Sequence, residues 1–458
     1  MKRADAIAVL DVGKTTARVV AVTASGEIVF SRRHSCNAQS SGGPYPHLDV
    51  EGTFDALCDG LATMGREVTP LGVMPVAHGA AAALLNEHEL ALPVMDYEAE
   101  PPADISAAYD AEAPDFTETL SPRLPAGLNL GRQLAWMQAS APGLFASART
   151  LVPFPQFWAW KLCGTAATEV SSLGCHTDLW DPREGRYSSL ARRRGWDRIF
   201  APMHPAGGVV GTVTPDLARR LGLPQGCPVH CGLHDSNAAA WRCIGSGDGS
   251  AAVLSTGTWF VALRPGGVAD RLDPGCDMLA NVAPDGTLVP SIRFMGGREA
   301  AAIAEPDTLS RASASAMGTV LAAGAMALPC FATAGGPFRD RSGTIIRGDG
   351  LDMAGRAALA VAYTALVSDW CLERLGGGNT VYVTGPFAGL PLFGAVLAAL
   401  RPAARVLVDT AADGTPLGAA LLARGRRGGG EGFQIAIPFD DPRLAIYRSA
   451  WHQAVTSR

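Results

Sequence analysis

The sequence lacks closely spaced cysteine pairs and long apolar runs. Its ten cysteines are scattered, and Cys227 and Cys231 do not have the two-residue spacing of a zinc knuckle or redox pair, so we expect reduced thiols. The first apolar run, residues 7–10, stops at Asp11 and is too short for a signal peptide. No later stretch is long enough to span a bilayer. These absences predict a cytoplasmic protein with no membrane partner.

The chain also lacks a large excess of charge of one sign. Its 38 Lys and Arg residues against 43 Asp and Glu residues leave a formal net charge of -5, which argues against a nucleic-acid partner. Residues are 48% hydrophobic and no low-complexity tract occurs, as in folded proteins. A chain of 458 residues exceeds what one core usually supports, so we predict two domains, at residues 1–239 and 240–458.

The chain opens with three apolar runs rich in strand formers, at residues 7–10, 18–22 and 28–30. Short polar turns separate them, which predicts an antiparallel meander. A helix follows, because Phe54, Leu57, Cys58 and Leu61 have helical spacing behind Thr53, a suitable cap.

The same opening returns in the second half. Residues 252–258 resemble residues 8–15, with a strand that leads into a glycine-bearing turn and a second strand. The repeat suggests a duplicated fold. Such turns suit phosphate, because glycine lets the backbone approach while successive N–H groups and hydroxyls point at the oxygens. An ordinary hairpin turn is the alternative for each.

The last third of the chain alternates between helix and strand. Helix is expected at residues 353–375 and strand at residues 381–384, followed by a glycine loop at residues 385–389. A helix with Pro391 in its first turn should then run to Leu400, before a strand at residues 405–408 and a small-residue helix at residues 419–424. Strand, glycine loop and helix suit a nucleotide.

Together these segments resemble the FGGY carbohydrate kinases. The matching motifs, in order, are DVGKTTAR at 11–18, residues 153–164 followed by 169–171, residues 196–211, GLHDSNAA at 232–239 and STGTW at 255–259. The resemblance implies an α/β fold of two ribonuclease-H-like, actin-like ATPase domains with a catalytic cleft between them. The His234–Asp235 pair and residues 78–85 look most like L-rhamnulose kinases, which suggests a ketose or deoxyketose, of the rhamnulose or fuculose kind.

The resemblance also implies roles for the residues around the sugar. Asp235 would be the catalytic general base that accepts the proton of the attacking hydroxyl. Capping of the following helix is its alternative role. His234, His78, Gly79 and Ser236 would bind the sugar, although a histidine here could be a satisfied buried side chain and Gly79 a bulge.

The implied cofactors are ATP and Mg²⁺. Asp11 would hold the metal through water, and otherwise would be a turn aspartate. Lys14 places a cation beside the phosphates, where many relatives have threonine or a small residue. A P-loop is excluded, because Ala8 stands where that motif requires glycine. The full implied cofactor set is Asp11, Gly13, Lys14, Thr15, Thr16, Arg18, Thr256, Gly257, Thr258 and Gly385.

Two departures from the family pattern bear on specificity. Residues 80–83 are all alanine, where rhamnulose kinases place a polar side chain near the sugar, and Pro386 and Phe387 replace the usual glycines of the adenosine loop. A catalytically silent ATP-binding or sugar-sensing protein on the same fold is the second hypothesis, and the retention of Asp11, Asp235 and both glycine-bearing turns argues against it. The expected partner is a small-molecule sugar, and a homodimer is one state that the sequence allows.

Overall fold

The computed structural model describes residues 3–36, 42–87, 89–244, 251–332, 335–411 and 413–457. These residues form two compact units. The first comprises Met1–Arg242, Ala280–Leu288 and Asp413–Gly428, and the second comprises Cys243–Leu279, Val289–Ala412 and Gly429–Arg458. The domain boundary at residue 239 stays a prediction.

The first unit is built on a seven-stranded sheet. β1 is antiparallel to β2, which is antiparallel to β3, as the predicted meander requires, and β1 is parallel to β4. The order is β3 (Ile28–Ser35), β2 (Thr16–Thr23), β1 (Ala4–Val12), β4 (Val68–Ala77), β10 (Pro228–His230) and β9 (Val209–Thr212), with β11 (Leu233–His234) paired to β4.

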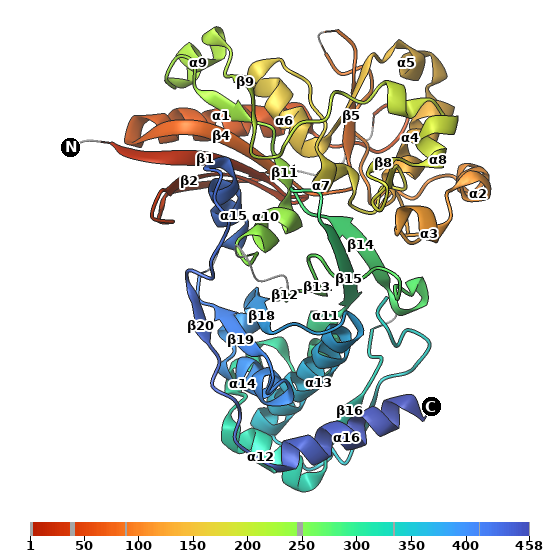
Figure 1. The fold of residues 1–458 in the computed structure, drawn as a ribbon, viewed down its shortest axis with the longest axis vertical. Coiled ribbons are helices and arrows are strands. Elements are labelled where there is room, and N and C mark those ends of the chain that lie inside the picture. Colours follow the sequence, from red (N-terminus) through yellow and green to blue (C-terminus); the bar gives the residue numbers. More distant parts are fainter. Residues whose placement is uncertain are drawn as a thin grey trace. The chain divides into compact units, whose positions relative to one another are not determined.

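Strand β1 is buried on both faces of this sheet. Ala8 and Leu10 belong to a core shared with helices α1 and α6, whereas Ile7 and Val9 belong to a core shared with α10 and α15. Helix α15 comes from the far end of the chain yet lies against β1, where Figure 1 shows it in blue beside the red strand. The four helices are α1 (Val50–Glu67), α6 (Phe154–Cys163), α10 (Asp235–Trp241) and α15 (Gly414–Ala423).

Two predicted helix starts need correction. Helix α1 exists, but Asp49 caps it by accepting from the Gly52 N–H, and Thr53 lies inside the helix, where its hydroxyl donates to the Asp49 carbonyl. Helix α15 begins at Gly414 rather than at residue 419. Pro416 falls in its first turn, where the missing N–H of proline needs no partner.

Smaller elements complete the first unit. The helices are α2 (Ala103–Glu112), α3 (Phe116–Thr119), α4 (Leu130–Ser140), α5 (Pro142–Ser147), α7 (Val170–Leu173), α8 (Ser189–Arg193) and α9 (Pro215–Leu221). The strands are β5 (Ala82–Leu85), β6 (Thr150–Pro153), β7 (Trp180–Asp181) and β8 (Arg186–Tyr187).

The second unit repeats the strand arrangement of the first. Strand β12 is antiparallel to β13 and parallel to β18, and β18 is parallel to β19. The order β15, β13, β12, β18, β19, β20 thus matches β3, β2, β1, β4, β10, β9 in strand direction, which confirms the duplicated α/β fold. The last two strands differ in chain order, because the edge strand β9 precedes β10 whereas the edge strand β20 follows β19. The strands are β14 (Met278–Val282), β15 (Leu288–Phe294), β13 (Phe260–Leu263), β12 (Ala251–Ser255), β18 (Thr380–Thr384), β19 (Arg405–Asp409) and β20 (Phe433–Ile435).

The two helices predicted for this unit are present as α13 (Met353–Arg374) and α14 (Pro391–Leu400). The unit also contains α11 (Gly296–Ile303), α12 (Ala314–Ala323) and α16 (Arg443–Thr456), which were not predicted, and a hairpin of β16 (Met326–Leu328) and β17 (Thr344–Ile346). None of the helices described in either unit is both long and apolar enough to cross a bilayer. None of the ten cysteines forms a disulfide, in agreement with the expectation of reduced thiols.

Candidate active site

Three predicted site residues lie at the carboxyl ends of neighbouring strands in the first unit. Asp11 is near the end of β1, His78 follows β4 and Asp235 follows β11. Strands β1 and β11 both run parallel to β4. Val12 of β1 and His234 of β11 each lie opposite Ala77 of β4. The register therefore brings the three side chains to one edge of the sheet.

Asp235 is the first residue of α10, and its side chain keeps 33% of its surface exposed. Its Oδ1 accepts from the Ser236 backbone N–H and hydroxyl, and lies 3.2 Å from Nε2 of His234. Burial raises the pKa of the carboxyl, while His78 and the Ser236 donors lower it. The N-cap position of α10 belongs to His234, which makes no side-chain cap bond, whereas the Asp235 carboxylate accepts from the Ser236 N–H of the first turn. The capping role of Asp235 therefore stays open beside its predicted role as a base.

His234 is 6% exposed and is held on both ring nitrogens. Nδ1 lies 3.2 Å from the Asn237 side-chain nitrogen, and Nε2 lies 3.6 Å from the Cys175 sulfur. Burial lowers the pKa of His234 to about 4, which keeps the imidazole neutral at physiological pH. A Cβ at Gly79 would lie 3.1 Å from His234 Nε2 and 3.2 Å from the Cys175 sulfur, so this position has little room for a side chain.

Asp11 is held by Arg18, which also binds a residue that the sequence analysis did not single out. The Arg18 Nε donates to Asp11 Oδ2 at 3.0 Å, and a terminal nitrogen donates to the same oxygen. The two terminal nitrogens donate to the carboxylate of Asp413 at 2.7 and 2.8 Å. Burial raises the pKa of Asp11, while Arg18 opposes that rise.

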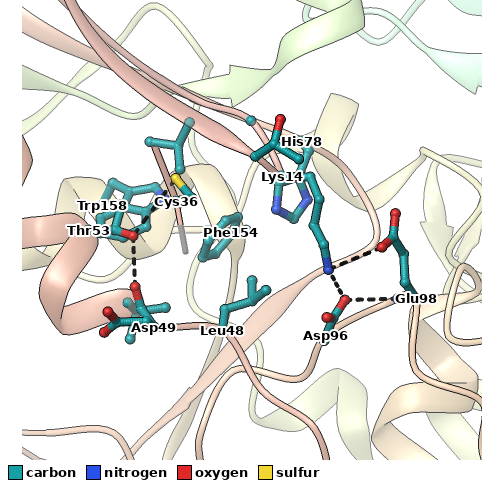
Figure 2. A pocket seen from close by; sticks show the side chains of 14 residues that line it. Lys14, Cys36, Leu48, Asp49, Thr53, His78, Asp96, Glu98, Phe154 and Trp158 are labelled. Carbon is teal, nitrogen blue, oxygen red and sulfur yellow. Dashed lines mark hydrogen bonds and ion pairs between the residues drawn. The ribbon is translucent and has the colours of Figure 1, made fainter. Parts of the chain in front are cut away.

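A pocket of about 210 Å³ opens in the first unit beside this edge. Its polar side carries Lys14, Asp96 and Glu98, whereas Phe154 and Trp158 belong to an apolar wall (Figure 2). Val12, Leu48, Val50, Cys36 and His78 also line it.

Lys14 does not project alone into this pocket. Its ammonium forms an ion pair with the buried Asp96, lies 3.7 Å from Glu98 and sits 4.9 Å from the centre of the Tyr97 ring. The His78 ring packs between Tyr97 and Phe154, and burial lowers its pKa. Sequence reasoning missed Asp96 and Glu98, because no local pattern links them to a lysine more than 80 residues earlier.

The remaining residues of the turn between β1 and β2, where phosphate binding is predicted, lie in one tight loop. The Gly13 N–H donates to the Thr16 carbonyl at 2.9 Å, which closes the turn between β1 and β2. Thr15 is exposed at its tip, and Gly13, Lys14 and Thr16 are half-buried.

The predicted nucleotide residues of the second unit also come together. The Thr256 hydroxyl donates to the Thr384 carbonyl at 2.6 Å and accepts from the Phe387 N–H at 3.1 Å. Gly385 has φ +83°, and a Cβ there would lie 1.9 Å from the Thr256 carbonyl oxygen. Gly257 is half-buried and Thr258 exposed, so the turn keeps an open side. Phe387 packs into the core against Phe260 and Phe393, which accounts for its replacing a glycine.

These residues fit the implied cofactors on chemical grounds. Arg18 occupies only Oδ2 of Asp11, and within the described residues no donor reaches Oδ1. One free carboxylate oxygen suits Mg²⁺, which keeps several waters and takes few protein ligands. The open backbone of the Thr256–Thr258 turn suits a phosphate, because successive N–H groups there can point at its oxygens.

Comparisons with known proteins agree with this geometry. The sequence profiles described as "FGGY family of carbohydrate kinases, N-terminal domain" and "Carbohydrate kinase FGGY, C-terminal domain" match residues 126–241 and 248–430. The chain is 28% identical to L-fuculokinase of Salmonella typhi over 280 residues, 58% of each protein. It is 25% identical to L-fuculokinase of Escherichia coli over 272 residues, 56% of that protein, so the matches span a little over half of these curated relatives.

Solved structures extend the similarity over the whole chain. A carbohydrate kinase from Novosphingobium aromaticivorans is 37% identical with a TM-score of 0.91, and the match covers 100% of this chain and 99% of that one. A xylulose kinase from Rhodospirillum rubrum shares the fold at 18% identity and a TM-score of 0.77, covering 99% and 98%. With both halves matched in sequence and the full length matched in structure, the chain belongs to the FGGY family of carbohydrate kinases.

Proposed function

We propose that the protein transfers the terminal phosphoryl group of ATP to a hydroxyl of a neutral ketose, with Asp235 as general base. The observation that carries this proposal is the position of the Asp235 carboxylate beside Asp11 and His78, at the strand edge next to the pocket. Phosphoryl transfer asks the protein mainly to position the nucleophile, neutralise charge and accept one proton. Residues suited to each task lie at this edge.

In the proposed reaction, Asp235 accepts the proton of the sugar hydroxyl while that oxygen bonds to the terminal phosphorus and the bond to the leaving ADP oxygen breaks. When bound, ATP supplies the phosphoryl group and Mg²⁺ neutralises its charge. Asp11 would hold the metal through water, with Arg18 fixing the carboxylate. Gly13, Thr15 and Thr16 would face phosphate oxygens.

We assign the nucleotide-binding residues of the second unit to one loop cluster. Thr256, Gly257 and Thr258 would present backbone N–H groups and the Thr258 hydroxyl to phosphates, and Gly385 would border the adenosine. The hydrogen bonds that tie Thr256 to Thr384 and Phe387 would keep this cluster rigid.

The pocket chemistry favours a neutral sugar. Among the described residues that line the pocket, Lys14 is the one lysine or arginine. Asp96 and Glu98 already face its ammonium group. A sugar carboxylate would therefore meet net negative charge. Ring and backbone polar groups of His78, Gly79 and Ser236, together with Lys14, would serve hydroxyls.

The apolar wall favours a deoxyketose such as L-fuculose or L-rhamnulose. Phe154, Trp158 and Val50 offer a surface on which a methyl group loses contact with water, whereas a hydroxyl there would lose hydrogen bonds. The naming of two relatives as L-fuculokinases supports the same class.

The test is ATP consumption by the purified chain with L-fuculose, L-rhamnulose, D-xylulose, glycerol and gluconate, repeated with Asp235→Asn. We expect turnover to be fastest with a deoxyketose and to fall by about 10²- to 10⁴-fold in the variant. Asp216→Asn, on the surface helix α9, is the matched control. Sugar binding measured by calorimetry without turnover of any substrate would instead identify a sensor.

A further inference from the structure

We propose that Lys14 and Glu98 together bind one secondary hydroxyl of the sugar and thereby select between epimeric ketoses, and that Lys14 is not a phosphate ligand. The proposal rests on the proposed function, and it deepens that function by naming residues that distinguish one sugar from another. It moves Lys14 from the predicted cofactor set to the sugar site.

The Lys14 side chain leaves the turn between β1 and β2 and ends beside the segment that carries Asp96 and Glu98 (Figure 2). The buried Asp96 carboxylate accepts a hydrogen bond from the ammonium and another from the Glu98 N–H, at 3.0 Å. The centre of the Tyr97 ring lies 4.9 Å from the ammonium. These contacts hold the ammonium at one point of the pocket wall.

The charge around Lys14 is unfavourable for a phosphate. The carboxylates of Asp96 and Glu98 both face this one ammonium, so the group as a whole is negative. The triphosphate of ATP is itself an anion, and the surplus carboxylate would repel it. A neutral hydroxyl meets no such repulsion.

The separation of Lys14 and Glu98 suits a hydroxyl between them. Lys14 Nζ and Glu98 Oε2 are 3.7 Å apart, beyond the usual N–H···O range of about 2.7–3.2 Å. A hydroxyl can accept from the ammonium and donate to the carboxylate at the same time. Within the described residues, Asp96 is the one acceptor of the ammonium and no group donates to the Glu98 carboxylate, so both keep capacity for a ligand.

The pair lies within the electrostatic range of the proposed base. Burial raises the pKa of Tyr97 to about 12. After burial, the negative charges of Glu98, Asp235 and Asp96 raise it further. The pocket carboxylates and the proposed base thus act on the same tyrosine, so a sugar bound at Asp235 has Lys14 and Glu98 within reach.

Lys14→Met tests which substrate the lysine binds. Methionine keeps an apolar side chain at the Tyr97 ring but has no N–H group to donate. With the sugar of highest kcat/KM among L-fuculose, L-rhamnulose and D-xylulose, the sugar KM should rise by about 10-fold or more, while the KM for MgATP changes by less than about threefold. Lys14→Thr, which installs the residue that many relatives carry, should show the same split. A raised KM for MgATP at a native sugar KM would overturn the proposal.

Lys161→Met is the matched control. Lys161 also combines an ion pair with a ring contact, because its ammonium lies 2.7 Å from Glu51 and 4.6 Å from the centre of the Phe54 ring. It is not among the residues that line the pocket. Both KM values should therefore stay native. An equal rise in sugar KM in this control would contradict the proposal, since it would trace the effect to the loss of any such lysine.

Discrimination between epimers gives a readout that a purely structural role would not change. Epimers of the best sugar at each secondary hydroxyl are compared, and L-fuculose and L-rhamnulose are one such pair, which differ at carbon 4. At one position the native chain should prefer one epimer by about 10²-fold or more in kcat/KM, because the other epimer leaves the ammonium and the carboxylate unpaired. In Lys14→Met and in Glu98→Met this preference should fall about 10-fold. Preferences that stay native at every position would overturn the proposal.

Calorimetry of sugar binding without nucleotide separates this proposal from the proposed function. The native chain should bind the tightest-binding sugar of the same panel at least about 10-fold more tightly than Lys14→Met does, whether or not ATP is consumed. Sugar binding without turnover refutes the proposed function alone. Equal affinity in the native chain and Lys14→Met refutes the role of the pair alone, and a native chain that binds none of these sugars contradicts both.

Discussion

Arg18 and Asp413 form a two-point ion pair although 395 positions separate them in the chain. The same guanidinium holds Asp11, so one arginine joins the end of β1 to the start of α15. Together with the packing of α15 on β1 and α10, the contact holds residues 413–428 in the first unit, and it makes a late segment part of the support of the candidate metal-binding carboxylate.

Asp413→Asn should weaken both the fold and the candidate nucleotide site. It leaves Arg18, whose side chain is 13% exposed, with a single carboxylate. We expect the first unit to lose about 1–3 kcal/mol of stability, between the values of exposed and buried pairs. Urea denaturation measures this change, and the KM for MgATP should rise because Asp11 is less well oriented.

The matched control is Asp216→Asn, which removes the same charge from an exposed pair with Arg219. Such pairs contribute about 0–1 kcal/mol, so stability should change little. Equal losses of unfolding free energy in the two variants would show that the Arg18–Asp413 pair contributes no more to stability than an exposed ion pair.

Gly79→Ala should impair catalysis more than folding. The new methyl group would press on His234 and Cys175 at 3.1–3.2 Å, and overpacking of this kind costs about 1–3 kcal/mol. If His234 in turn displaces Asp235, and half of this free energy is lost from transition-state stabilisation, kcat falls about 3- to 10-fold. Steady-state kinetics measures the effect. Gly143→Ala, where nothing lies within 4 Å of the new Cβ, is the control and should keep native kcat.

The strands that open each unit and the long helices α1 and α13 were predictable because their signals are local. Residues 7–10 and 381–384 are short apolar runs between turn residues, and α13 ends at Arg374, just before the glycines at 376–378 that predicted its end. The start of α1 was misplaced because Asp49 and Thr53 can both cap a helix, and the choice depends on whether the Gly52 N–H faces the side chain.

The polar partners of the site could not be predicted in the same way. Lys14 pairs with Asp96, and Arg18 pairs with Asp413, through contacts made only after the sheet has formed. No spacing in the sequence marks Asp96 or Asp413 as a partner. That Asp11 and Asp235 lie close together was predictable only through the family motifs. Their proximity depends on strand order and register, which no local sequence pattern reveals.

Gly385→Ala should damage the second unit severely. The residue has φ +83°, and its Cβ would lie 1.9 Å from the Thr256 carbonyl oxygen, so the backbone must move. Gly376 has φ +85° with open space around it, so Gly376→Ala measures the conformational cost alone, about 1–2 kcal/mol. We expect Gly385→Ala to cost at least about 1–3 kcal/mol more and to raise the KM for ATP. Equal midpoints in urea denaturation would contradict the predicted clash.

Glu169 should make stability depend on pH. It is fully buried, with Ser171 and Ser172 donating to its carboxylate, and burial raises its pKa to about 7 against these hydrogen bonds. The folded state therefore binds the proton more tightly than the unfolded state, and stability falls as pH rises from about 5 to about 7. The contribution of this residue amounts to about 2–3 kcal/mol.

Glu169→Gln tests that contribution. The variant should be less stable than the native chain at every pH from 5 to 8, because an amide nitrogen cannot accept the hydrogen bonds of Ser171 and Ser172. Its side chain at this position does not titrate. The native chain loses stability with rising pH and the variant lacks that component, so the gap between their free energies of unfolding should narrow between pH 5 and pH 8. Other titrating groups cancel in the difference. A gap that stays constant over this range would mean that Glu169 is ionised in the folded protein at pH 5.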